Sequence, residues 1–180
     1  LHRQILFGAD DTGKPKALAA RDRLHALNPA ITLHAHDAEL TDENAPGLFA
    51  SYDIIIDGTD NFPAKFLIND VAVKLGKPVV YGAIQGFDGQ VSVFDAAHGP
   101  CYRCLYPESP RGQVQNCAEA GVIGALAGIA GTMQAMEAIK LIAAHHSFAP
   151  LRGTLWMIDA KTMETRILAI RKNPDCPVCS

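Results

Sequence analysis

The sequence predicts an α/β fold in which an open, mixed sheet carries an antiparallel extension. The parallel part is predicted because short apolar runs, each followed by polar residues, alternate with segments of helical periodicity. The extension is predicted because the rhythm changes after Ile84, where Val91, Val93 and Phe94 follow the turn-forming pair Asp88-Gly89. Strands linked through helices are typical of βαβ units, in which neighbouring strands run parallel.

The composition is that of one globular domain with an ordinary core. The 180 residues are 48% apolar and 19% charged, and 16 Lys+Arg against 19 Asp+Glu leave a formal net charge of −3. A chain of this length buries roughly 70% of the surface that its unfolded form exposes, so the cysteines are not needed as disulfide scaffolding. No basic cluster is present to neutralise the phosphates of a nucleic acid. No secretory leader is recognisable, so a cytoplasmic location is expected.

The first predicted element is a helix over residues 15–27. Its apolar residues recur every three or four positions, Pro15 is tolerated in a first turn, and Asn28-Pro29 ends the pattern. Residues 31–35 alternate apolar and polar side chains, which predicts a short, half-buried strand. Residues 41–44, Thr-Asp-Glu-Asn, then predict a helix start.

The central elements form one strand–helix–strand unit. Residues 54–56 are all isoleucine and predict a parallel strand that is buried on both faces. Residues 62–75 follow helical spacing and stop at Gly76. Residues 78–82 predict the next buried strand. The polar run Asp57-Gly58-Thr59-Asp60-Asn61 therefore lies at the carboxyl end of the first strand.

The last elements are an antiparallel strand within residues 86–94, a long helix over residues 119–144 and a hairpin of residues 154–160 and 165–171. Glycines lie on nearly one stripe of the helix: Gly121, Gly124, Gly128 and Gly131. We expect this stripe to pack closely, either within the subunit or across a dimer. The most apolar stretch of the helix is too short for a bilayer, so no membrane span is expected.

Two CxxC pairs are the sharpest local signal, Cys101-Tyr102-Arg103-Cys104 and Cys176-Pro177-Val178-Cys179. Four thiolates suit a tetrahedral zinc ion, and such a closed site leaves no open position for catalysis. The site would tie the last residues to the middle of the domain. The alternative is a pair of redox-active or incidental cysteines. A thioredoxin-type CxxC begins a helix, however, whereas Cys176 lies in a proline-interrupted tail.

The fifth cysteine, Cys117, comes directly before the sequence Ala118-Glu119-Ala120-Gly121, where the long helix is predicted to begin. A helix N-terminus stabilises a thiolate, so Cys117 is a candidate nucleophile. An inert, buried cysteine is the alternative, and the residues alone favour it.

The polar run at residues 57–61 lies where open α/β sheets bind ligands. Its carboxylates suit Mg²⁺ beside phosphate oxygens, and Asp60 is a stronger candidate than Asp57. A turn that only caps the following helix would use the same residues. Arg3 and Lys16 are candidates for phosphate contacts, although each taken alone could be a solvated surface residue. No hydrolase motif or Walker-type phosphate loop is present.

These motifs follow one another in a single order. They are Arg3-Gln4, Gly13-Lys14-Pro15-Lys16, the run at 57–61, Gly82-Ala83-Ile84 leading into Gly89-Gln90-Val91, the first CxxC pair, Cys117 to Gly121, and the second CxxC pair. In this order they resemble the MoeB/ThiF/HesA family, the adenylyltransferases that activate small ubiquitin-like sulfur carrier proteins and are related to ubiquitin-activating enzymes. The resemblance covers essentially all 180 residues. It implies a Rossmann-like sheet with a structural zinc site.

The resemblance implies ATP-dependent activation of the C-terminal Gly-Gly carboxylate of a carrier protein. The carboxylate attacks the α-phosphorus of ATP, pyrophosphate leaves and an acyl-adenylate remains. A carboxylate is already ionised at neutral pH, so the reaction needs charge neutralisation and in-line placement rather than a general base. By this resemblance Arg3 and Lys16 contact the triphosphate. Asp60, with Asn61 beside it, holds Mg²⁺, and Gln4 helps to frame the nucleotide site.

The resemblance also implies roles for the cysteines and for partners. Cys101, Cys104, Cys176 and Cys179 match the structural zinc ligands of the family. Cys117 matches the position at which some members carry a cysteine for thioester or acyl-disulfide chemistry, while others use adenylation alone. The expected partners are a sulfur carrier of the MoaD or ThiS type and a second copy of the chain, packed through the apolar helix.

The sequence departs from the family at its start. The glycine-rich nucleotide loop, the acidic residue that binds ribose and a further arginine precede the Arg3-Gln4 motif in the family, and this chain opens on Leu1. We therefore expect residues 1–180 to be a single domain that lacks its first strand and glycine loop and binds ATP poorly as it stands. Two alternatives stay open: a NAD- or FAD-linked oxidoreductase on the same sheet, and a non-catalytic zinc-stapled module that binds a ubiquitin-like protein.

Overall fold

The computed structural model of the chain describes residues 3–109 and 121–180. The chain divides into two compact units, Leu1–Leu40 and Thr41–Ser180. That residues 1–180 act as a single domain stays a prediction. Cys117, the candidate nucleophile, lies outside the described residues.

The first unit contains a 3-10 turn, Ala9–Asp11, and the helix α1, Lys16–Leu27. The helix confirms the one predicted from residue 15, and Pro15 stands directly before its first turn. The strand predicted over residues 31–35 is wrong. A strand needs a hydrogen-bonded neighbour, and the described part of this unit contains no other strand. The predicted alternation is present only in side-chain exposure, because Leu33 and Ala35 are less exposed than the residues around them.

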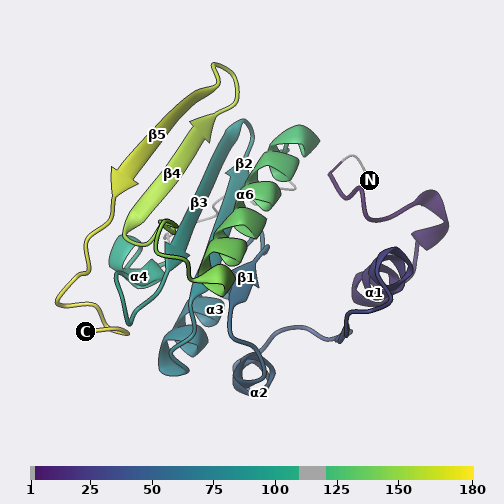
Figure 1. The fold of residues 1–180 in the computed structure, drawn as a ribbon, viewed down its shortest axis with the longest axis horizontal. Coiled ribbons are helices and arrows are strands. Elements are labelled where there is room, and N and C mark those ends of the chain that lie inside the picture. The colour runs from purple at the N-terminus through teal and green to yellow at the C-terminus, as the bar shows by residue number, and fades with distance from the viewer. Residues whose placement is uncertain (1–2, 110–120) are drawn as a thin grey trace. The chain divides into compact units, whose positions relative to one another are not determined.

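The second unit is built on a five-stranded sheet in the order β1-β2-β3-β4-β5 (Figure 1). The strands are β1 (Ile55–Asp57), β2 (Val79–Gln85), β3 (Asp88–Phe94), β4 (Thr154–Asp159) and β5 (Glu164–Ala169). β1 pairs with β2 in parallel, and each later pair is antiparallel. The predicted open mixed sheet with an antiparallel extension and a terminal hairpin is therefore confirmed.

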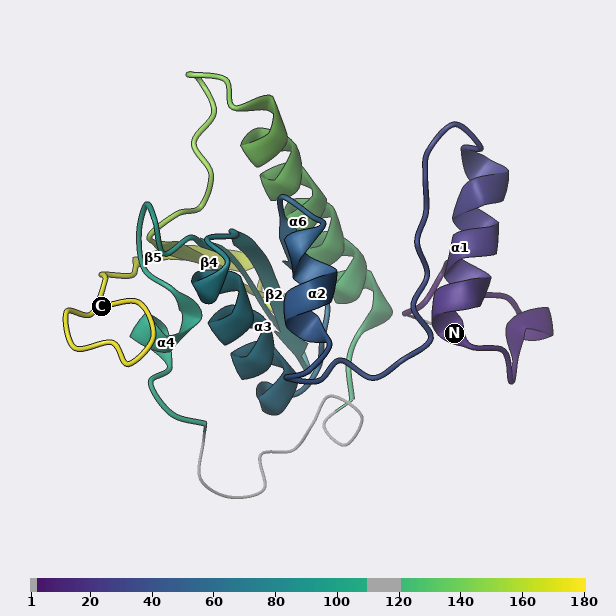
Figure 2. The ribbon, with the colours of Figure 1, turned by 90° about the horizontal axis from the view of Figure 1, so that it is seen from below.

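Helices cover both faces of the sheet at β2 and β3. They are α3 (Phe62–Lys74), α4 (Tyr102–Leu105) and α6 (Gly124–Ala143), whereas α2 (Ala45–Ala50) packs on α3. α6 lies on the face that Val80 and Val93 share, where Ala138 joins their apolar cluster. Tyr81 points to the opposite face, since side chains alternate along a strand, and its ring contacts Tyr102. Figure 2 shows the sheet with α6 on one side and α3 on the other.

The predicted helix over residues 62–75 is confirmed by α3. Asn61 caps its N-terminus by accepting a hydrogen bond from the backbone N–H of Ala64, at 2.9 Å. Pro63 occupies its first turn, where the missing N–H costs nothing. Gly76 then takes a φ of 63°, a left-handed conformation that glycine adopts without strain, and the helix ends.

The long helix α6 is confirmed, but it begins at Gly124 rather than at residue 119. Gly121 precedes it with a φ of 72° and accepts a hydrogen bond from the backbone of Gly86. A side chain added at Gly128 or Gly131 would meet nothing within 4 Å, so these two glycines do not pack closely against the described part of the chain. None of the helices within the described ranges is both long enough and apolar enough to cross a bilayer.

β1 differs from the prediction in the burial of one residue. Ile55 is 8% exposed, whereas Ile56, on the other face, is 53% exposed. The prediction that this strand is buried on both faces is therefore wrong for Ile56. β1 forms one edge of the described sheet, and the helix on that face, α6, packs on β2 and β3 instead.

Candidate functional site

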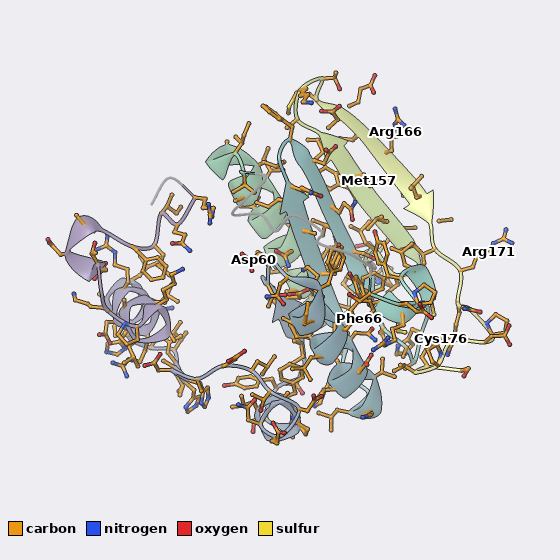
Figure 3. All side chains as sticks on the ribbon, turned by 180° about the vertical axis from the view of Figure 1, so that it is seen from behind. Asp60, Phe66, Met157, Arg166, Arg171 and Cys176 are labelled. Carbon is orange, nitrogen blue, oxygen red and sulfur yellow. The ribbon has the colours of Figure 1, made fainter. Side chains whose placement is uncertain are left out.

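Four cysteines from distant parts of the second unit come together. Cys101 stands at the N-terminus of α4 and Cys104 within it, while Cys176 and Cys179 lie in the tail that follows β5. All four sulfur atoms lie within 4.8 Å of one another. Figure 3 shows the tail with Cys176 returning to α4. The two CxxC pairs therefore form one cluster, as predicted.

The spacing of the sulfur atoms fits a tetrahedral zinc ion. Four sulfurs at a Zn–S distance of ~2.3 Å lie about 3.8 Å apart. The sulfur–sulfur distances are 3.6 Å for Cys101–Cys176, 3.5 Å for Cys104–Cys179 and 4.0 Å for Cys101–Cys104. A redox pair requires only two of these thiols, so the convergence of all four favours the metal site over the redox alternative.

The surroundings of the cluster favour the thiolate form of Cys176. Burial acts to raise the pKa of the Cys176 thiol, but the backbone N–H groups of Val178 and Cys179 outweigh it and lower this pKa to about 7. Burial raises the pKa of Cys101 well above its ordinary value. A bound cation would offset this, because a metal ion favours the deprotonated form of each coordinating thiol.

Residues of α3 hold the first CxxC pair in place. The side-chain oxygen of Asn69 accepts a hydrogen bond from the backbone N–H of Tyr102, at 2.8 Å, and Asn69 is 2% exposed. Arg103 donates two hydrogen bonds to the carboxylate of Asp70, at 2.7 and 2.6 Å, and stacks over the ring of Phe66. The two cysteines of this pair are therefore positioned before any metal binds.

A second polar arrangement lies at the carboxyl end of β1, where the sequence predicts a ligand site. Asp57 is 2% exposed, and both of its carboxylate oxygens are used. One accepts hydrogen bonds from the backbone N–H and the hydroxyl of Thr59, at 2.8 and 2.6 Å. The other accepts from the ammonium group of Lys65, at 2.7 Å. Asp57 therefore holds the loop together, which explains why it is the weaker candidate for a metal ligand.

Two residues of this arrangement were missed by the sequence analysis, Lys65 and Gln134. Lys65, on α3, is 7% exposed and also donates to the carbonyl of Gly82 at 3.0 Å. Gln134, on α6, donates its amide to the carbonyls of Asp57 and Val80, at 2.8 and 3.1 Å. Each is a polar residue among buried apolar neighbours of a helix, and that pattern is the signal that could have identified them.

Asp60 and Asn61 follow in the same loop and differ in what they contact. Asp60 is exposed at the end of β1 (Figure 3), where a ligand can reach it. The side-chain oxygen of Asn61 caps α3, so the capping interpretation is correct for Asn61. A nucleotide role for either residue stays a prediction.

In the first unit, Gln4 and Lys16 line one hollow of about 170 Å³. Asp11 and Lys14 also line it and form an ion pair at 3.1 Å. The backbone N–H of Gly8 and the Lys14 ammonium lower the pKa of the Asp11 carboxyl. Arg3 is exposed. The roles of Arg3, Gln4 and Lys16 toward a nucleotide stay predictions.

The fold and the site define a class of α/β protein. Its members have a polar loop at the carboxyl end of β1 and a four-cysteine cluster that ties the tail to the first CxxC pair. The model of the ThiF family matches residues 1–178. The chain belongs to this family.

Similar curated proteins include adenylyltransferases and an activating enzyme. The sulfur carrier protein adenylyltransferase of Thermus thermophilus is 49% identical over 185 residues, which cover 99% of this chain and 68% of the relative. The probable adenylyltransferase/sulfurtransferase MoeZ of Mycobacterium tuberculosis is 46% identical over 182 residues, which cover 98% and 46%. The SAMP-activating enzyme E1 of Haloferax volcanii is 42% identical over 180 residues, which cover 99% and 66%. The chain thus spans from under half to about two thirds of their lengths.

Solved structures agree on the fold. The microcin C7 biosynthetic enzyme MccB in complex with N-formylated MccA superposes with a TM-score of 0.85, at 18% identity, over 99% of this chain and 56% of that one. The complex of Escherichia coli MccB with MccA-N7isoASN gives a TM-score of 0.84, at 19% identity, over 99% and 55%. At these identities the likeness describes architecture alone.

Proposed function

We propose that the protein activates a ubiquitin-like sulfur carrier protein by adenylating the carboxylate of its C-terminal Gly-Gly. The observation that carries the proposal is the loop after β1. In this loop Asp60 is exposed, while its neighbours Thr59 and Asn61 are held by hydrogen bonds. The chain that contains the loop belongs to the ThiF family. The names of the relatives from Thermus thermophilus and Haloferax volcanii support the same substrate class.

The reaction needs little acid–base chemistry from the protein. The carrier carboxylate is ionised at neutral pH and attacks the α-phosphorus of ATP, and pyrophosphate leaves. What the protein supplies is in-line placement and neutralisation of the negative charge on the phosphates. An exposed carboxylate at a strand end suits Mg²⁺, which lowers the charge of the triphosphate when bound. In this proposal Asp60 holds Mg²⁺, with Asn61 beside it.

In this proposal, cationic and polar residues of the first unit also contact the nucleotide. Lys16 and Gln4 border one hollow, and the exposed Arg3 is close to them in the sequence. A guanidinium matches pairs of phosphate oxygens, and an ammonium acts as a compact charge. We assign Arg3 and Lys16 to the phosphates and Gln4 to the edge of the nucleotide site.

The four-cysteine cluster is structural in this proposal. Cys101, Cys104, Cys176 and Cys179 hold zinc, and four thiolates leave no position at which the ion could bind substrate. Cys117 stays a candidate for a later thioester or acyl-disulfide step, separate from adenylation.

The partners in the proposal are a carrier of the MoaD or ThiS type and a second copy of the chain. A homodimer is supported by the outer face of α6, where Met136 and Ile139 are each 53% exposed and Ile142 is 73% exposed. Exposed apolar side chains grouped on one helix are typical of a protein–protein contact. The cytoplasmic location expected from the sequence belongs to the same proposal.

Exchange of labelled pyrophosphate into ATP tests the proposal in the full-length protein. We expect exchange that depends on a carrier ending in Gly-Gly. Replacing Asp60 by Asn should lower the rate of exchange by about 10²-fold or more, which is typical of losing a group that stabilises charge in the transition state. Asp53, an exposed carboxylate two residues before the start of β1, offers a matched control, and D53N should keep the wild-type rate.

The alternatives give different results in the same experiment. Carrier binding without exchange in the wild-type protein would support the non-catalytic module. Absorbance of a bound flavin or nicotinamide would support the oxidoreductase. Full exchange in D60N, with a normal response to Mg²⁺, would remove Asp60 from the mechanism.

A further inference from the structure

The loop that carries Asp60 is fixed on both sides of that residue. On one side, Thr59 donates two hydrogen bonds to a single oxygen of Asp57, at 2.8 and 2.6 Å, and closes an Asx-type turn. On the other side, the side-chain oxygen of Asn61 accepts from the backbone of Ala64 at the start of α3. Asp60 is the exposed residue between these two contacts, so its direction depends on what holds Asp57.

Lys65 holds Asp57 from the α3 face of the sheet. Its ammonium donates to the second carboxylate oxygen of Asp57 at 2.7 Å and to the carbonyl of Gly82 at 3.0 Å. The side chains are 7% and 2% exposed, so little water competes for these bonds. The ammonium also lies 4.8 Å from the ring centre of Tyr81, where a cation is attracted to the aromatic face. One buried cation therefore ties the loop to β2.

Gln134 holds the carboxyl end of β1 from the α6 face. Its amide nitrogen donates to the carbonyls of Asp57 and Val80, one on each strand of the parallel pair. Gly82 leaves room for it, since a Cβ at that position would lie 2.5 Å from the Gln134 side chain. Lys65 and Gln134 thus connect the carboxyl end of β1 to residues 80–82 of β2 from opposite faces.

We propose that Lys65 is a positioning residue for the reaction, which acts through Asp57 and Thr59 to set the direction in which Asp60 meets the metal–nucleotide complex. The inference rests on the proposed function, because it assigns Asp60 to that complex. Lys65 does not touch substrate in this account, since its ammonium is buried and bonded to Asp57 and Gly82. Loss of Lys65 should therefore change the Mg²⁺ concentration that pyrophosphate exchange requires. It should leave the affinity for the carrier unchanged.

The test compares K65M and K65R with the wild-type full-length protein. In K65M we expect the Mg²⁺ concentration for half-maximal pyrophosphate exchange to rise roughly tenfold or more, as the loss of a residue that orients a metal ligand does. The KM for the carrier should stay constant. K65R keeps a buried cation for Asp57 and should restore most of the Mg²⁺ response. T59V removes one of the two bonds within the turn and should shift the Mg²⁺ response in the same direction as K65M.

Lys140 is a matched control for the loss of stability that follows when a lysine–carboxylate ion pair is broken. Its ammonium lies 2.6 Å from a carboxylate oxygen of Glu137, whose side chain is 3% exposed. K140M should lower thermal stability and leave the Mg²⁺ response unchanged. If Lys65 were only structural, K65M would behave like K140M: fewer folded molecules, with the same half-saturating Mg²⁺. That result would overturn the inference.

Hydrogen exchange of the backbone separates this inference from the proposed function. In K65M, the amides of residues 58–60 should exchange faster than in the wild-type protein and in K140M, with no nucleotide present. Faster exchange without any adenylation by the wild-type protein would retain the link from Lys65 to the loop and reject the proposed function. Unchanged exchange at these amides would overturn the inference, whatever the activity.

Discussion

Asp57 and Asp60 are two carboxylates three positions apart with opposite surroundings. Asp57 is 2% exposed and bonded through both oxygens, whereas Asp60 is exposed. The sequence predicted the site of both and preferred Asp60 as a ligand. It did not predict Lys65 or Gln134, because a periodicity argument assigns a buried face to a helix and says nothing of which polar groups that face meets.

Gly82 offers a prediction at this scale. In G82A the added methyl would lie 2.5–2.8 Å from three atoms of the Gln134 side chain, so Gln134 must move and weaken its bonds to Asp57 and Val80. We expect a loss of about 1–3 kcal/mol in the free energy of unfolding, typical of overpacking. Urea denaturation measures it.

Gly47 is the matched control for G82A. It lies within α2, where an added Cβ would meet nothing within 4 Å. G47A should therefore raise stability by about 0.5–1 kcal/mol through helix propensity. A G82A protein as stable as G47A would mean that Gln134 is not packed against Gly82.

At the scale of elements, α3 connects the two polar arrangements of the second unit. Asn61 caps its start, Lys65 follows one turn later, and Asn69 and Asp70 hold the first CxxC pair. The existence and bounds of α3 were predictable from the helical spacing of its apolar residues and from Gly76, because both are local signals in the sequence. The strand predicted over residues 31–35 was not correct, since pairing is not a local property and alternation alone cannot supply a neighbour.

The tail after β5 gives a prediction at the same scale. C176S removes one of four ligands, so the protein should lose most of its zinc, measured by atomic emission. The melting temperature should fall by about 5 °C or more, given about 2–4 °C per kcal/mol in a domain of this size. R171A alters an exposed residue of the same tail and should keep both values. Undiminished zinc in C176S would exclude a four-thiolate site.

At the scale of the whole molecule, the described sheet has helices on both faces at β2 and β3, and β5 is exposed along its whole length. The mixed sheet was predictable from the alternation of apolar runs with helical periodicity, and the convergence of the cysteines from the two CxxC pairs. The exposure of Ile56 was not, because it depends on which strands α6 covers. The exposure of Met136, Ile139 and Ile142 on the outer face of α6 was not predictable either, because it also depends on how the helix packs on the sheet.

The outer face of α6 leads to a prediction about assembly. If a second copy packs there, I139K should place a charge in an apolar contact and shift the protein toward monomer, measured by sedimentation velocity. Met163, 62% exposed in the β4–β5 turn, is the matched control, and M163K should sediment as the wild type. A wild-type monomer at high concentration would refute the dimer.

The shortness of β1 has a consequence for how the chain finds its native alignment. Three residues offer few contacts to distinguish the correct pairing with β2 from a slip by one position, and such a slip turns every side chain to the other face. In a slipped strand, Asp57 would be turned away from Lys65, leaving a cation in the interior without its anion. The buried ion pair therefore favours the native register of β1 over a register shifted by one residue.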